Sequence, residues 1–166
     1  QVLDLVAADR AVETGDYDEA IRIFEDLLSQ NPTLTDAYLG LGGLQLETGD
    51  YTSAEVSFAR AARLEPNSFA AQFGHGRVLE ALARHSDAIR AYQRALVLDP
   101  DSLAATMGIT GCYLEIDRPG SAIRYAERAI ELDPERVRAH LDLATAYELS
   151  GRYEDAVAEY EIALEL

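Results

Sequence analysis

Small and aromatic residues recur along this chain of 166 residues at a fixed spacing of 34 residues. One such position is alanine in every interval: Ala20, Ala54, Ala88, Ala122 and Ala156. A second is aromatic in all intervals but one: Phe24, Phe58, Tyr92, Ala126 and Tyr160. Apolar residues around them follow the one-sided spacing of amphipathic helices. The pattern predicts repeated helices, in which alanine lets paired helices approach closely and rings fill the space between neighbouring repeats.

Helix-breaking residues recur with the same period. Prolines stand at the end of four intervals: Pro32, Pro66, Pro100 and Pro134. Because a proline disfavours the α conformation of the residue before it, each one is expected to end a helix. A second break falls midway, at Gly15, Gly49, Ala83, Asp117 and Gly151. Two helices of about a dozen residues fit within each period, and Asp16 and Glu19 have the spacing of a capping box at the start of a second helix.

These features together resemble tetratricopeptide repeats. The Gly-x-Tyr-x-x-Ala motif of that family appears in residues 15–20, 49–54 and 151–156, while His85 and Pro119 stand where tyrosine is usual. The resemblance covers the whole chain and implies an all-α fold, a right-handed superhelical solenoid of antiparallel helix pairs. It also implies a concave groove lined by the first helix of each pair. We expect one repeat domain, residues 1–166, with copies at 1–34, 35–68, 69–102, 103–136 and 137–166.

The charge of the chain restricts its partners. Fourteen basic against 30 acidic residues give a formal net charge of −16, which repels phosphate backbones and anionic lipids. No stretch approaches the roughly 18 apolar residues of a membrane span. We therefore expect a soluble protein with a protein or peptide partner, no nucleic acid and no direct membrane insertion. The chain begins at Gln1 without a methionine, so we expect it to be a fragment of a longer protein and leave its compartment open.

Residues that could carry chemistry are few. His75, His85 and His140 lie in different copies, and no cysteine or carboxylate stands near any pair at a metal-ligand spacing. His75 is expected to be a packed histidine and Cys112 a buried structural cysteine. No nucleophile, base and orienting group converge. We expect no metal, no cofactor, no catalytic residue and no enzyme activity within this sequence.

Glycine is more frequent in the predicted first helices than helix crossings require. The excess residues are Gly40, Gly43, Gly74, Gly108 and Gly111. Each costs a helix interior up to about 1 kcal/mol relative to alanine. No strand precedes them and no Lys-Ser or Lys-Thr pair follows, which argues against a phosphate-binding loop. Two explanations stay open: a ligand pressed against the groove wall, or drift in a solenoid with stability to spare.

The expected groove has an apolar column with acidic neighbours. The column is Leu5, Leu39, Phe73, Met107 and Leu141, and the glutamates beside it are Glu13, Glu47, Glu80, Glu115 and Glu148. An exposed apolar stripe usually marks a binding surface, although packing of the superhelix, or cover by flanking chain, would also explain it. The predicted partner-binding residues are Leu5, Asp9, Glu13, Leu39, Gly43, Glu47, Phe73, Arg77, Glu80, Met107, Gly111, Leu114, Glu115, Leu141, Thr145 and Glu148.

Two specialisations of the family do not fit these residues. Chaperone-binding members hold a terminal carboxylate with lysine and asparagine, whereas the first copy has Leu5 and Asp9 and the chain has no lysine. Glycosyltransferase-linked members carry a ladder of asparagines. The matching column here is Val6, Gly40, Gly74, Gly108 and Asp142.

The sequence therefore predicts a scaffold or adaptor that binds a peptide or helix segment, apolar or amphipathic with basic residues. A regulatory or substrate-presenting arm of a larger enzyme and a self-assembly module are the alternatives. The last helix is apolar through Val157, Tyr160, Ala163, Leu164 and Leu166. Because an interior copy would cover such a face, we expect this end to self-associate or to fray, and the parent protein to continue beyond it.

Overall fold

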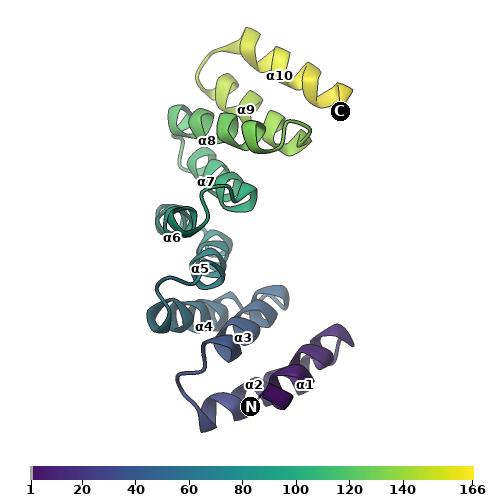
Figure 1. Ribbon diagram of the computed structural model, residues 1–166. Coiled ribbons are helices and arrows are strands. Elements are labelled where there is room, and N and C mark those ends of the chain that lie inside the picture. The colour runs from purple at the N-terminus through teal and green to yellow at the C-terminus, as the bar shows by residue number, and fades with distance from the viewer. Residues whose placement is uncertain (1) are drawn as a thin grey trace. The chain divides into compact units, whose positions relative to one another are not determined.

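The protein is all-α, as the sequence predicts. The computed structural model describes residues 2–166, and within them it contains ten helices and no strand. Figure 1 shows them in chain order: α1 (Val2–Glu13), α2 (Tyr17–Gln30), α3 (Thr35–Glu47), α4 (Tyr51–Leu64), α5 (Phe69–Ala81), α6 (His85–Leu98), α7 (Leu103–Glu115), α8 (Pro119–Leu132), α9 (Val137–Leu149) and α10 (Tyr153–Glu165). Each predicted copy contains two helices.

The helices form two compact units that meet in the chain between Leu82 and Ala83. The first unit contains α1 to α5 and the second α6 to α10. Inside each unit every helix packs on the next one in the chain. First helices of neighbouring pairs also touch, α1 with α3 and α3 with α5 in the first unit, and α7 with α9 in the second. This second set of contacts places the first helices side by side within each unit.

The period of breaks sets where the helices end. Each helix before a proline ends two residues short of it, at Gln30, Leu64, Leu98 and Leu132, as predicted. At the midway break the chain turns through a left-handed residue at every copy, with a positive φ at Gly15, Gly49, Ala83, Asp117 and Gly151. Glycine adopts this conformation without strain, which explains the family motif; alanine and aspartate carry it at some cost in the third and fourth copies.

The predicted capping box at Asp16 and Glu19 is only half formed. The Asp16 carboxylate accepts a hydrogen bond from the Glu19 backbone N–H at 3.3 Å, so Asp16 caps α2. The Asp16 N–H, however, donates to the Ala11 carbonyl at 2.8 Å, and the Gly15 N–H donates to Val12 at 3.0 Å. This is the Schellman arrangement that closes α1. Because the N–H is already used, the Glu19 carboxylate instead pairs with Arg22.

The alanine column lies in the cores of the two units. Ala20, Ala54, Ala88 and Ala122 are completely buried and Ala156 is 3% exposed. In the aromatic column Phe24, Phe58 and Tyr92 are 1%, 6% and 2% exposed, whereas Tyr160 on α10 is half-buried. One side of each first helix packs against these buried columns. The other side of each first helix remains accessible.

Candidate functional site

The sixteen residues predicted to bind a partner lie on the accessible sides of the first helices. None is buried. Half-buried are Leu5, Leu39, Gly43, Phe73, Glu80, Met107, Gly111, Leu114 and Thr145; exposed are Asp9, Glu13, Glu47, Arg77, Glu115, Leu141 and Glu148. In the first unit they come from α1, α3 and α5, and in the second from α7 and α9.

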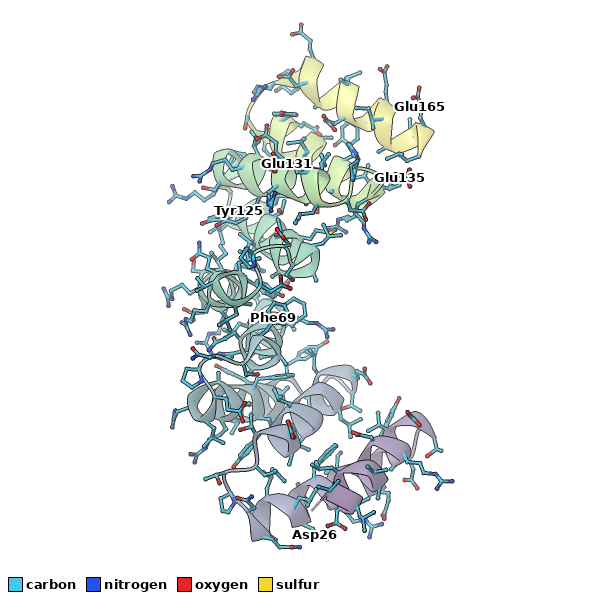
Figure 2. All side chains as sticks on the ribbon, in the orientation of Figure 1. Asp26, Phe69, Tyr125, Glu131, Glu135 and Glu165 are labelled. Atoms are coloured by element: carbon cyan, nitrogen blue, oxygen red, sulfur yellow. The ribbon has the colours of Figure 1, made fainter. Side chains whose placement is uncertain are left out.

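The apolar column divides its surface between packing and solvent. In the first unit, Leu39 packs against the cluster of Ala54, Phe58 and Val78, and Leu5 packs against the cluster that contains Phe24. Phe73 is stacked on Phe69, with ring centroids 5.5 Å apart and planes at 11°; Figure 2 labels Phe69 on α5. Repeat packing thus accounts for part of the column, and the remaining surface is available to a partner.

In the second unit the column is more open. Leu141 is 37% exposed and Met107 is half-buried. Thr145 bonds back to the Leu141 carbonyl at 2.9 Å, so its hydroxyl is used within α9. Glu148 accepts a hydrogen bond from the Tyr160 hydroxyl at 3.1 Å. The face of α7 and α9 therefore offers apolar surface beside a carboxylate that α10 already orients.

A cavity of about 410 Å³ opens between α1, α2 and α3 in the first unit. It brings together five of the predicted residues: Asp9, Glu13, Leu39, Gly43 and Glu47. Four more residues line it that were not predicted to bind a partner: Val12, Phe24, Gly40 and Leu44. The signal that could have found it is the pair of glycines three apart on α3, Gly40 and Gly43, which removes two side chains from the side of that helix that lines the cavity.

Neither explanation offered for the excess glycines fits Gly40, Gly74 and Gly108. A Cβ atom at Gly40 would lie 2.3 Å from the Phe24 ring, and one at Gly74 would lie 2.2 Å from the Phe58 ring. At Gly108 the distance to the Tyr92 ring is 2.7 Å. Each ring of a second helix therefore occupies the place of a missing side chain on the next first helix. Packing requires these three glycines.

Gly43 is different, because a Cβ atom there would meet nothing within 4 Å. No neighbouring side chain needs the space that this glycine leaves. Gly43 lines the cavity. Of the two explanations given for the excess glycines, a ligand pressed against the groove wall stays open for Gly43.

Where the fourth copy packs on the fifth, at the last junction between copies, a different pair of residues stands in place of the ring and the glycine. Position 126 is alanine instead of an aromatic residue, and position 142, where the second, third and fourth copies have glycine, is aspartate. Asp142 is 6% exposed, and its carboxylate accepts a hydrogen bond from the Arg138 guanidinium at 2.7 Å. Burial raises the pKa of Asp142, while the bond to Arg138 and its charge oppose the rise. This ion pair, in which the aspartate is buried and the arginine is exposed, was not predicted from the sequence.

His140 is buried and held by two partners. Its Nδ1 lies 2.7 Å from the Glu159 carboxylate and its Nε2 lies 2.8 Å from the Pro134 carbonyl. Cys112 is fully buried, as predicted, and His75 on α5 is half-buried. In residues 2–166 no three histidine, cysteine or carboxylate side chains gather as a metal would need. None of the helices described is long and apolar enough to cross a membrane.

Comparisons with known proteins identify the repeat. Tetratricopeptide repeat models match residues 11–74, and residues 73–119 and 113–166. A comparison with curated sequences gives no match. A crystal structure of MamA is similar with a TM-score of 0.95 at 27% identity, covering 99% of this chain and 90% of that one.

Two further structures share the fold. MamA of Desulfovibrio magneticus RS-1 has a TM-score of 0.93 at 21% identity, over 99% of this chain and 93% of that one. YrrB, described as a TPR protein with an unusual peptide-binding site, has a TM-score of 0.89 at 20% identity, over 98% and 84%. All three are repeat solenoids, which is the fold class expected from the sequence.

Proposed function

Since this chain belongs to the tetratricopeptide repeat family, we propose that it is an interaction scaffold or adaptor that binds a peptide or helix segment of a partner protein on the faces of its first helices. The observation that carries the proposal is the apolar column, whose residues are half-buried or exposed on every first helix. YrrB, which shares the fold, is described as having a peptide-binding site. Binding, without a catalytic step, is the role assigned to the chain.

The chemistry of these faces favours a segment with apolar anchors and basic neighbours. Apolar side chains such as Phe73 and Met107 provide contact area. Exposed carboxylates, among them Glu47 and Glu115, attract cationic groups beside the anchors. The net charge of −16 disfavours acidic peptides, nucleic acids and anionic lipid surfaces.

An array of dodecapeptides of varied sequence tests the proposal directly. The best binders are expected to carry apolar residues next to arginine or lysine, and Phe73→Ala and Met107→Ala are expected to weaken binding by about 1 kcal/mol or more. Val56→Ala and Val97→Ala are matched controls, because Val56 on α4 and Val97 on α6 are 62% and 80% exposed and lie on second helices. Acidic best binders, or equal binding by all four variants, would overturn the proposal.

The exposed face of α10 supports a second role, self-association. Val157, Ile162 and Leu164 are 54%, 40% and 87% exposed, and only Ala156 of this helix is buried. In the other copies, except at the fourth junction, the ring of the second helix is seated on a glycine of the next first helix. If α10 of one molecule packed on α1 of another as neighbouring copies do, Tyr160 would face Val6 instead of a glycine. The valine side chain would occupy the space that the ring needs. We infer that pairing of two α10 helices in a closed dimer is favoured over an open filament.

A further inference from the structure

The cavity between α1, α2 and α3 combines an apolar floor with an acidic rim. Phe24 and Leu44 at its base are 1% and 2% exposed, and Val12 and Leu39 are half-buried. Its volume of about 410 Å³ lies in the range of small-ligand sites. We propose that this cavity receives one arginine side chain of the bound partner segment, a specificity site that rests on the proposed function and deepens it.

The rim presents three carboxylates with no counterion of their own. Asp9 and Glu13 are four residues apart on α1 and so lie on the same side of that helix, and Glu47, the last residue of α3, lines the same cavity. All three are exposed. Within residues 2–166 none of them forms a hydrogen bond or ion pair through its side chain, and no basic residue lines the cavity. A cation brought by a partner would relieve the repulsion among them.

An arginine pairs with a carboxylate elsewhere on the first helices of this protein. On α9, the Arg138 guanidinium donates to Asp142 at 2.7 Å, and the Arg138 side chain remains 67% exposed while the Asp142 side chain is 8% exposed. At the cavity of the first unit the carboxylates are present and the arginine is absent. The partner supplies it.

Arginine fits this combination better than other side chains. Its apolar stem can cover the floor formed by Val12 and Leu39, while its head stays at the rim. The guanidinium offers five donors in a rigid fork and can serve several carboxylates at once. It is also more weakly hydrated than an ammonium group, so entering a half-apolar cavity costs less.

Gly43 provides the means to close the cavity without disturbing the fold. A Cβ atom there meets nothing within 4 Å, so Gly43→Leu is expected to place a bulky side chain in the cavity, to block the path of an arginine and to keep α3 helical. Gly120 is the matched control. It also lies in a helix, α8 of the second unit, and a Cβ atom there meets nothing within 4 Å.

Nuclear magnetic resonance titration of the ¹⁵N-labelled chain with N-acetyl-arginine N-methylamide tests the site without a partner. The amide signals of Gly40 and Gly43 are expected to shift saturably. The citrulline derivative, which has the same shape but no charge, should bind at least about 10-fold more weakly, since charge-assisted hydrogen bonds are lost. Gly43→Leu should abolish the shifts and Gly120→Leu should retain them. Equal shifts with citrulline, shifts that persist in Gly43→Leu, or no shift near Gly43 would overturn the site.

The peptide array separates this site from the proposed function. With Gly43→Leu, the preference for arginine should disappear from the best binders, while their dependence on Phe73 and Met107 remains. If the arginine preference survives in that variant, the cavity proposal is wrong and the scaffold proposal stands. If binding never depends on Phe73 or Met107, the scaffold proposal fails, and the titration still decides whether the cavity binds arginine.

Discussion

The Tyr92 ring lies where a side chain at Gly108 would begin: a Cβ atom on Gly108 would be 2.7 Å from Cε2 and Cζ of Tyr92. Tyr92 is 2% exposed and cannot swing into solvent. The packing of α7 on α6 therefore depends on the absence of a side chain at position 108.

Gly108→Ala is expected to destabilise the protein although alanine favours helices. The intrinsic gain is about 1 kcal/mol, whereas overpacking a close contact costs about 1–3 kcal/mol, so we expect a net loss of roughly 1 kcal/mol in urea denaturation. Gly43→Ala is the control, because its Cβ meets open space, and it should stabilise the chain. A stabilised Gly108→Ala variant would contradict the ring-on-glycine packing.

The contact between the fourth and fifth copies should adopt the ring-on-glycine packing of the other copies if Ala126 and Asp142 are changed together. Ala126→Tyr alone would direct a ring at the buried Asp142, and Asp142→Gly alone would leave space beside Ala126. The double variant restores a ring opposite a glycine. We expect a favourable coupling energy of about 1 kcal/mol or more between the two substitutions, measured by urea denaturation of all four proteins at neutral pH. Strictly additive effects would show that the two positions do not meet.

His140 should make stability depend on pH. Burial disfavours its charge, but the hydrogen bond to Glu159, the bond to the Pro134 carbonyl and the Glu159 charge together raise its pKa above 6.5. A carbonyl and a carboxylate both accept, so the charged ring satisfies both partners. The stabilisation is fully present below the unfolded pKa, near 6.5, and is lost as pH rises through the higher folded value.

Thermal denaturation between pH 5.5 and 8.5 measures this loss, and His140→Gln is the matched variant. Gln72, at the equivalent position of the third copy, donates to the Pro66 carbonyl at 3.2 Å, so glutamine can keep the corresponding bond to Pro134. The variant should lose the His140 contribution to the pH dependence and retain the fold. Burial also raises the pKa of Asp142, which lowers stability as pH rises, but Asp142 is present in both proteins and its contribution cancels in the comparison. Parallel curves would refute the prediction.

Self-association through α10 should appear as a mass that rises with concentration in light scattering, towards a dimer. Leu164→Glu is expected to return the protein to a monomer, since Leu164 is 87% exposed and the change disturbs no internal packing. Val97→Glu, at 80% exposure on α6, is the control and should not alter the mass. A monomer whose residues 153–166 resist hydrogen exchange as strongly as the central helices would count against both pairing and fraying.

The sequence by itself determined the repeat, the ten helices and their ends. Prolines such as Pro32 and the turn at Gly15 act on their immediate neighbours, so their 34-residue period can be read without knowing what packs where. The alanine column likewise marked the cores, because a residue type repeated at one position in every copy indicates a similar environment in each copy.

Only the tertiary structure decided what each residue on the first helices does. Gly40 and Gly43 look alike in the sequence, yet one faces the Phe24 ring and the other faces open space. His140 meets Glu159, 19 residues away, and Asp142 is buried although aspartate usually is not. These outcomes depend on the directions of side chains from two or three helices at once, and local preference along one helix carries no information about them.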